Sequence, residues 1–205
     1  MDLGAGLPAS FGLNADQAAD FDRYLTLLVR WNARINLTAV RTPEEIVSRH
    51  FVECLFAARQ IPANVKTLLD FGSGAGFPGI PVAIVRPEIA VTLAESQGKK
   101  AAFLREVVRT LGLKAEVWSG RVEALPAERV FDRVMLRAVD KMAEACGSAI
   151  LRLSPEGRLM VFATRKTEPA LDTLAEPNGL QWEPALPLPG SQQGILKLGH
   201  RLRKE

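Results

Sequence analysis

A glycine-rich stretch decides the fold of this chain: DFGSGAGFPG, at positions 70–79. It follows an apolar run at 65–70 that is typical of a short buried strand, and it leads into a helical pattern at 79–85. Glycine lets the backbone turn sharply and lets a bound molecule approach the main chain. The helix that follows offers free N–H groups at its start. The stretch therefore predicts a ligand site where a first strand meets a helix.

Strand and helix patterns alternate after this loop. The pattern predicts further strands at 89–94, 115–118, 131–136 and 157–164, and helices at 97–111, 141–153 and 168–175. Such alternation indicates a doubly wound α/β fold whose mostly parallel sheet has helices on both faces. Two last strands, at 180–188 and 194–202, have no helix between them, which suggests an antiparallel hairpin at one edge. We expect a seven-stranded, Rossmann-like sheet.

The residues before the loop are helical in pattern and contain no predicted strand. Asn14 begins one helix with a capping box, and Thr42 begins a second with proline at its first position. The segment between them, 32–40, is polar and predicts an irregular turn. We therefore divide the chain into an N-terminal helical extension, residues 1–62, and one compact core unit, residues 63–205.

Two ligand motifs overlap in the glycine loop. Gly74, Gly76 and Gly79 fit G-x-G-x-x-G, the dinucleotide fingerprint. Asp70 and the glycines at 72, 74 and 76 fit D-x-G-x-G-x-G, which resembles the cofactor loop of class I, Rossmann-like methyltransferases. A carboxylate here repels a pyrophosphate, whereas S-adenosylmethionine carries a positive ammonium and a positive sulfonium. Asp70 therefore favours S-adenosylmethionine as the cofactor.

Residues further along match an adenosine. Glu95, followed by Ser96, ends the second predicted strand, where a carboxylate can accept hydrogen bonds from both ribose hydroxyls. NAD sites use the same arrangement, so Glu95 does not choose between cofactors. Val122 follows the third strand, where it can pack on an adenine. Glu123 can accept from the exocyclic amine, and is equally explained as a surface charge.

The region after the fourth predicted strand narrows the reaction. Cytosine-C5 methylation needs a nucleophilic cysteine, and residues 131–141 contain none. Enzymes that methylate exocyclic amines resemble one another in an Asn/Asp-Pro-Pro-aromatic loop, which residues 136–140 lack. Guanine N7 is an acceptor with a lone pair and no proton, so its methylation needs no general base. Arg137 suits either the cofactor carboxylate or a guanine acceptor.

Composition is that of a globular protein with a mild basic excess. The net charge of +3 and a pI of about 9.1 favour a polyanionic partner only mildly, and a GC-rich genome equally explains the excess of arginine. No apolar stretch is long enough to cross a bilayer, and residues 1–10 lack a signal-peptide pattern. Cys54 and Cys146 are expected to be buried, reduced thiols. We expect a cytoplasmic monomer that needs no metal.

Several motifs resemble one family, in the right order over residues 20–165. They are WNARINLT at 31–38, Arg49-His50, the run at 70–81, Glu95-Ser96 with Lys99-Lys100 and Phe103-Leu104, Arg121-Val122-Glu123 and Arg137-Ala138. Together they resemble the bacterial small-subunit ribosomal RNA guanine-N7 methyltransferases, also called the glucose-inhibited division protein B family. The box at 31–38 and the run at 70–81 are highly specific in combination.

The resemblance implies methylation of one guanine of 16S rRNA at N7, with N-terminal helices that lie over the pocket and help to engage RNA. The candidate cofactor-binding residues are Asp70, Gly72, Gly74, Gly76, Phe77, Glu95, Ser96, Val122, Glu123 and Arg137. The candidates for catalysis are Asn36, His50 and Arg137, and those for RNA contact are Asn32, Thr38, Arg121, Arg165 and Lys166. From the residues alone, His50 is equally a packing or capping histidine, and the box at 31–38 a capped turn between helices.

The chain departs from the family pattern in two places. Glu53-Cys54 stands where the family usually has Asp-Ser, which is a conservative change. Residues 164–167 read Thr-Arg-Lys-Thr where the family tends to show Lys-Gly, so a specific role for Lys166 does not carry over. Arg165 and Lys166 can still contact phosphate.

Three other functions fit parts of the pattern. A nicotinamide-dependent oxidoreductase would use the glycines at 74, 76 and 79, but Asp70 and the lack of a convincing Tyr-Lys or His site disfavour it. A non-catalytic RNA-binding module would have no need of the complete glycine loop. Methylation of a small molecule or a protein stays open, because the charge of the chain does not prove that it binds RNA.

Overall fold

The computed structural model describes residues 7, 11–139, 141–175, 177 and 179–202. Most of the stretch 1–10, in which we found no signal-peptide pattern, therefore lies outside the described residues. Asp140, in the loop after the fourth strand, lies outside them as well.

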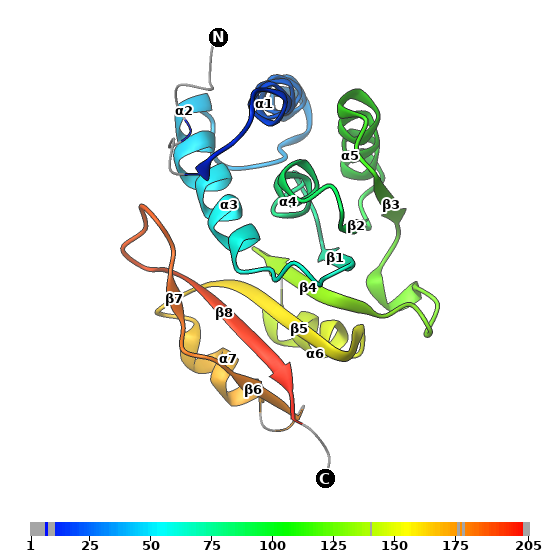
Figure 1. The fold of residues 1–205 in the computed structure, drawn as a ribbon, viewed down its shortest axis with the longest axis vertical. Coiled ribbons are helices and arrows are strands. Elements are labelled where there is room, and N and C mark those ends of the chain that lie inside the picture. The colour runs from blue at the N-terminus through cyan, green and yellow to red at the C-terminus, as the bar shows by residue number, and fades with distance from the viewer. Residues whose placement is uncertain (1–6, 8–10, 140, 176, 178, 203–205) are drawn as a thin grey trace.

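One eight-stranded sheet forms the centre of the molecule (Figure 1), in the order β3-β2-β1-β4-β5-β8-β6, with β7 also on β8. The strands are β1 (Thr67–Phe71), β2 (Ala90–Glu95), β3 (Ala115–Ser119), β4 (Phe131–Arg137), β5 (Leu153–Thr164), β6 (Leu180–Trp182), β7 (Leu186–Pro187) and β8 (Gly194–Arg201). Strands β1 to β5 pair in parallel, and β8 runs antiparallel to its neighbours. The chain order reverses between β1 and β4, which is where sheets of this kind bind ligands.

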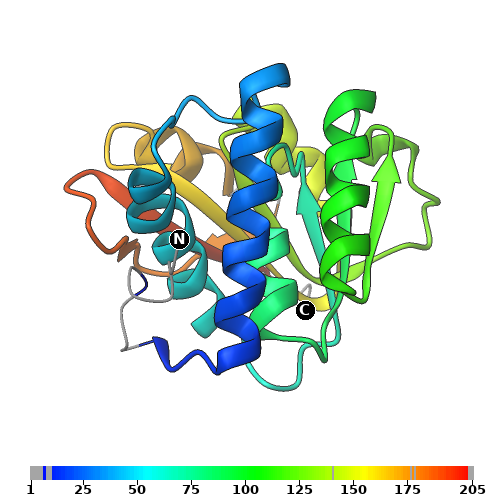
Figure 2. The same ribbon diagram turned by 90° about the horizontal axis from the view of Figure 1, so that it is seen from above.

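Helices cover both faces of the sheet (Figures 1 and 2). They are α1 (Ala15–Ile35), α2 (Pro43–Glu45), the π-helix η3 (Ile46–Phe51), α3 (Val52–Arg59), α4 (Gly79–Val85), α5 (Gly98–Leu111), the 3-10 turn η4 (Val122–Ala124), α6 (Met142–Ile150) and α7 (Glu168–Ala175). Helices α1, α3, α4 and α5 lie on one face, and α6 and α7 lie on the other (Figure 1). Figure 2 shows α1 running beside α5, against which it packs.

Each face of the sheet has its own apolar core. Because side chains alternate along a strand, Leu68 enters the core under α1, α3, α4 and α5, while its neighbour Leu69 enters the core under α6 and α7. Tyr24 of α1 is fully buried in the first core, and its hydroxyl donates to the carbonyl of Ala75 at 2.6 Å. This hydrogen bond joins α1, in the N-terminal part of the chain, directly to the glycine loop.

The predicted fold class is confirmed, and one detail of the sheet is corrected. The predicted strand at 180–188 is two short strands, β6 and β7, so the sheet has eight strands rather than seven. Pro184 lies in the break between them, and proline has no N–H to donate to a ladder. The predicted antiparallel pair at one edge is confirmed, with β6 outermost and β8 between β5 and β6.

Candidate active site

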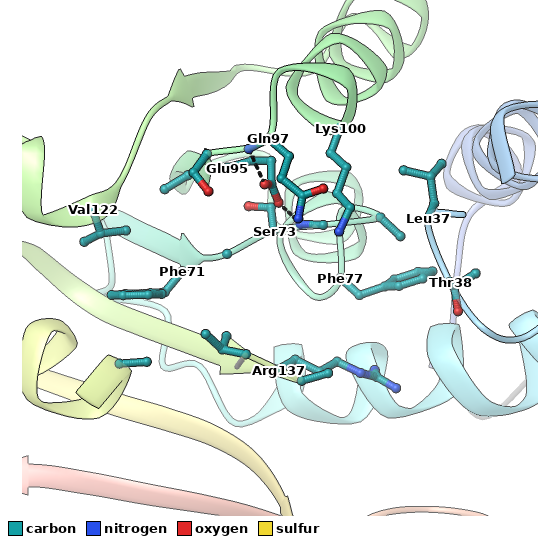
Figure 3. A pocket seen from close by; sticks show the side chains of 18 of the residues that line it. Leu37, Thr38, Phe71, Ser73, Phe77, Glu95, Gln97, Lys100, Val122 and Arg137 are labelled. Carbon is teal, nitrogen blue, oxygen red and sulfur yellow. Dashed lines mark hydrogen bonds between the residues drawn. The ribbon is translucent and has the colours of Figure 1, made fainter. Parts of the chain in front are cut away.

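A cavity of about 760 Å³ opens at the carboxyl ends of β1, β2 and β4. Its walls come from the glycine loop, the end of β2, η4, the end of β4 and the turn that follows α1. In Figure 3, Phe71 and Val122 lie at one end of the cavity, and Leu37 and Thr38 lie at the other. Arg137 lies nearer the Thr38 end in this view.

The glycine loop needs its glycines for shape and for packing. Gly72 and Gly74 have positive φ angles of 72° and 55°, and both line the cavity. A Cβ atom on Gly79 would lie 2.3 Å from Leu93 Cδ2 and 2.6 Å from Asp70 Oδ2. The loop therefore presses against its own strands and offers main chain, rather than side chains, to a ligand.

Glu95 is the carboxylate that faces the cavity. Its Oε2 accepts a hydrogen bond from Gly74 N at 2.9 Å, and its Oε1 accepts one from Gln97 N at 2.7 Å (Figure 3). The side chain is buried, so these two main-chain donors hold it in one position. Each carboxylate oxygen keeps a lone pair that can accept a further hydrogen bond from a ligand. The buried rings and methyls of Phe71 and Val122 beside it suit an apolar ring.

Asp70, on which the choice of cofactor rested, lies behind the loop and does not line the cavity. It is fully buried; its Oδ2 accepts from Gly79 N at 3.1 Å, and its Oδ1 has no partner within the described part of the chain. Burial raises the pKa of Asp70 to about 7, against hydrogen bonds from Ser73 and Gly79 that lower it. Direct attraction between Asp70 and a cationic ligand therefore does not describe this geometry. Asp70 joins the end of β1 to the start of α4, and Glu95 is the buried acid that lines the cavity.

Arg137, at the end of β4, is the centre of a side-chain network. Its Nη2 donates to Glu53 Oε2 at 2.5 Å and to His50 Nδ1 at 2.7 Å, and its Nη1 donates to Cys54 Sγ at 3.2 Å and to the carbonyl of His50 at 3.5 Å. Arg137 and Glu53 are only 10% and 8% exposed. Both Nη groups therefore bind η3 and α3, rather than pointing to the cofactor carboxylate or guanine that the sequence suggested as partners.

Glu53 and Cys54, which form one of the two departures from the family pattern, are both partners of Arg137. Burial raises the pKa of Glu53, although the charge of Arg137 acts in the opposite direction. Burial raises the pKa of the Cys54 thiol to about 12, so this sulfur stays protonated. Both positions thus help to orient a buried guanidinium.

His50 owes its position to a π-helix. The amide of Val52 donates to the carbonyl of Val47, the wider i→i−5 spacing, and turns of this kind are frequent at functional sites. This turn directs His50 and Glu53 to the same guanidinium. The His50 ring packs on Phe77 with 4.7 Å between centroids. Burial, together with the charges of Arg137 and Arg49, lowers the pKa of His50 to about 3, so the imidazole is neutral at physiological pH.

Asn32 holds the turn that carries Thr38 into the cavity. Its Oδ1 accepts from Thr38 N at 2.9 Å, and its Nδ2 donates to the carbonyl of Val40 at 3.3 Å. Asn32 itself is buried and does not line the cavity. Thr38 lines it, with its Oγ1 at 3.1 Å from His50 Nε2.

Most of the predicted site residues converge on the cavity. Those that line it are Thr38, His50, Gly72, Gly74, Phe77, Glu95, Ser96, Arg121, Val122, Glu123 and Arg137. Asn32, Asp70 and Gly76 are buried behind its walls, and Asn36, Arg165 and Lys166 are exposed outside the lining. Asn36 ends α1 in the left-handed conformation, with φ 49°, and accepts from Arg41 at 3.1 Å.

Sequence reasoning assigned no role to several residues that line the cavity. They are Arg49, Phe71, Gln97, Lys100 and Lys141. Phe71 and Gln97 adjoin strand ends that were predicted, so their proximity could have been inferred from the sheet alone. Arg49 and Lys100 come from helices, and which side of a helix faces the cavity depends on tertiary packing.

The described residues provide neither a group of side chains that could hold a metal ion nor a helix that could span a membrane. Across the described ranges, no three His, Cys, Asp or Glu side chains gather in a way that could hold a metal ion. No helix in the described part of the chain is both long enough and apolar enough to span a bilayer.

The fold and the cavity define a class. The solved structure of mitomycin 7-O-methyltransferase superposes with a TM-score of 0.63 at 19% identity, over 95% of this chain and 70% of that chain. With the glycine loop and Glu95 at the carboxyl edge of the sheet, the chain is a class I, Rossmann-like methyltransferase, and S-adenosylmethionine is its methyl donor.

Residues 17–181 match the family described as rRNA small subunit methyltransferase G, and the chain belongs to that family. The ribosomal RNA small subunit methyltransferase G of Xanthomonas campestris pv. campestris is 48% identical over 163 residues, which are 78% of this chain and 74% of the relative. The protein of the same name from Stenotrophomonas maltophilia is 43% identical over 181 residues, which are 88% of this chain and 84% of the relative. The resemblance seen in the sequence motifs is confirmed.

Proposed function

We propose that this enzyme transfers the methyl group of S-adenosylmethionine to N7 of one guanine in the 16S rRNA of the small ribosomal subunit. Family membership supports the RNA, and one observation in the cavity carries the choice of atom. The imidazole of His50 is no base, because its Nδ1 already accepts from Arg137 and its pKa is about 3. An exocyclic amine must lose a proton to become methylated, whereas N7 attacks with a lone pair and has no proton to lose.

The end of the cavity with Glu95 is assigned to the cofactor. When bound, S-adenosylmethionine supplies a methyl group on a sulfonium, which leaves as a neutral thioether while N7 forms its bond to carbon. Glu95 accepts hydrogen bonds from the ribose hydroxyls, Val122 packs on the adenine, and Glu123 accepts from its exocyclic amine. Gly72 and Gly74 allow the cofactor to approach the main chain.

The opposite end is assigned to the RNA. Arg49 is exposed at this end, and Arg121 and Lys141 are exposed elsewhere around the cavity, where their charges suit the phosphates next to a target base. Arg165 and Lys166, in the loop after β5, extend this basic surface beyond the cavity. Asn36 and Asn32 contribute through the turn after α1 and do not touch the reacting base.

We further propose a cytoplasmic enzyme that acts as a monomer and without a metal. Transfer from a sulfonium is an in-line displacement in which the protein mainly supplies positioning. Residues 1–62 then form the RNA-facing extension of a core unit at 63–205. The extension supplies both Thr38 and His50 to the cavity, which supports this division of roles.

A labelled-methyl assay tests the function. The full chain is incubated with tritiated-methyl S-adenosylmethionine and either small ribosomal subunits or free 16S rRNA from cells that lack the gene. We expect label in 7-methylguanosine, at one guanine that becomes open to borohydride–aniline cleavage. Label in another nucleoside, label in ribosomal protein, or cleavage that is already present in cells without the gene contradicts the proposal.

A further inference from the structure

The hydrogen-bond network around Arg137 has a defined direction. A guanidinium has N–H donors and no acceptor, so the 2.7 Å contact between Arg137 Nη2 and His50 Nδ1 requires that Nδ1 carry a lone pair. A neutral imidazole has one proton, which must then lie on Nε2. The low pKa of His50 agrees with a single proton on the ring. The ion pair with Glu53 fixes the guanidinium that imposes this tautomer.

The same logic fixes the proton of the Thr38 hydroxyl. His50 Nε2–H donates to Thr38 Oγ1 at 3.1 Å, and the amide of Val40 donates to the same oxygen at 3.2 Å. A hydroxyl oxygen has two lone pairs, and both are used by these donors. Among the described residues, none accepts the remaining Thr38 hydroxyl hydrogen. Because Thr38 lines the cavity, this hydrogen is left for a ligand.

We propose that Thr38 selects the target base by donating its hydroxyl hydrogen to O6 of the guanine that is methylated. This inference rests on the proposed function and deepens it, because it names the residue that recognises the base. His50 and Arg137 act as positioning residues, since they prevent the hydroxyl from turning its hydrogen inwards.

The chemistry of the purine edge selects O6. A donor on N7 would occupy the lone pair that must attack the methyl group, so N7 itself is excluded as the acceptor. In guanine, O6 lies next to N7 on the same edge and accepts. Adenine has an amino group there, which donates, so a hydroxyl locked as a donor would face another donor. The arrangement therefore favours guanine over adenine as well as orienting it.

The test combines a substitution in the protein with the replacement of the target guanosine in the RNA by an analogue that lacks one functional group. After the methylated guanine has been mapped, ligated 16S rRNA is prepared with guanosine, 2-aminopurine riboside or inosine at that position and reconstituted into small subunits. 2-Aminopurine keeps N7 and lacks O6, whereas inosine keeps O6 and lacks the 2-amino group. Rates of methyl transfer are measured for the wild type, Thr38→Val and Thr38→Ser. Thr173→Val is the matched control, because Thr173 is exposed on α7 and bonds only within its own helix.

We expect Thr38→Val to lower kcat/KM on guanosine by roughly tenfold to hundredfold, as for a buried acceptor that is left without its donor. Wild type should lose a similar factor on 2-aminopurine, where Thr38→Val should cause little further loss. Inosine should show the full effect of the variant. Thr38→Ser keeps the hydroxyl and should lose much less activity than Thr38→Val, and Thr173→Val should retain full activity.

Two results overturn the proposal. One is a wild type that methylates 2-aminopurine as fast as guanosine, a comparison that needs no variant to fold. The other is a loss in Thr38→Val that is as large on 2-aminopurine as on guanosine, with S-adenosylmethionine binding intact. A wild type that methylates no guanosine at all contradicts the proposed function instead, so the two failures are distinguishable.

Discussion

The two ends of the cavity are built from different parts of the polypeptide. At the cofactor end, main-chain N–H groups of Gly74 and Gln97 hold the single carboxylate of Glu95. At the base end, hydrogen bonds between side chains run from Glu53 through Arg137 and His50 to Thr38. Main-chain geometry follows from the fold, and the solved structure with 19% identity shows that this fold persists while sequences diverge. The second end needs particular side chains from separate elements.

The largest expected effect comes from breaking the side-chain end at its centre. Arg137→Met leaves the buried Glu53 without its partner, which should lower the free energy of unfolding by about 3 kcal/mol. Methyl transfer should fall by about two orders of magnitude, since His50 and Thr38 lose their orientation. Urea unfolding and initial rates on small subunits measure the two effects.

A double variant separates stability from function. Arg137→Met with Glu53→Gln removes the uncompensated charge, so it should regain much of the lost stability and none of the activity. Recovery of activity together with stability would show that Arg137 acts only as a structural ion pair.

The main-chain end should fail through sterics rather than charge. Gly79→Ala puts a methyl group 2.3 Å from Leu93 Cδ2, which should lower the unfolding free energy by about 2 kcal/mol and weaken S-adenosylmethionine binding. Gly98→Ala is the control, because a Cβ there meets nothing within 4 Å. Thermal unfolding and calorimetric titration compare them. Equal losses in both variants would contradict the packing argument.

The carboxylate of Asp70 provides a further test of the main-chain end, because it lies behind the glycine loop and supports it. Its folded pKa, about 7, lies above its ordinary value of 3.8, so its contribution to stability is complete below pH 3.8 and is lost as the pH rises through 7. Asp70→Asn lacks this titration. The stability of the wild type relative to the variant should therefore fall by about 2 kcal/mol between pH 5.5 and pH 8.

The same pH series includes an internal check. His50 acts with the opposite sign, since its pKa is lowered to about 3, but it is present in both proteins and cancels in the difference. Urea unfolding at both pH values measures the difference, and one that does not change with pH would contradict the buried position of Asp70.

The smallest expected effect concerns Glu95, the buried carboxylate at the cofactor end. Glu95→Gln keeps one acceptor oxygen and loses the charge, so the Kd for S-adenosylmethionine should rise about tenfold. The free energy of unfolding should fall by about 1 kcal/mol, because one of the two main-chain N–H groups loses its acceptor. The exposed Glu123 offers the control, and Glu123→Gln should shift the Kd less. Calorimetric titration of both variants decides whether Glu95 or Glu123 is the stronger contact.

Sequence patterns predicted which residues meet at the Glu95 end of the cavity, because the signals there are local. The glycine loop and Glu95 each lie at the end of a short apolar run, and a parallel sheet brings such ends to one edge. The same patterns could not predict the direction in which the Asp70 side chain points. A strand that is buried on both faces has no polar side to mark which residues face a ligand.

At the base end, Thr38 and His50 were predicted only through the family resemblance, whereas Arg137 was also a candidate because it ends a predicted strand. Thr38, His50 and Arg137 are far apart in sequence, and their contacts depend on how the N-terminal helices pack on the sheet. The π-helix at Ile46–Phe51 leaves no mark in the apolar pattern, because one extra residue in a turn barely shifts it. Glu53 and Cys54 stood out merely as departures until the structure showed their common partner.

The wide turn at Ile46–Phe51 makes the activity sensitive to a change in chain length that the fold would tolerate. Deleting one residue there would restore ordinary helical spacing, yet it would rotate the preceding residues by about 100° relative to α3. His50 and Glu53 would then point in different directions, although both flanking helices remained intact. Relatives that lack this residue are therefore expected to fold and to bind the cofactor but not to methylate RNA. A gap at this position of an aligned sequence then identifies a family member without the activity.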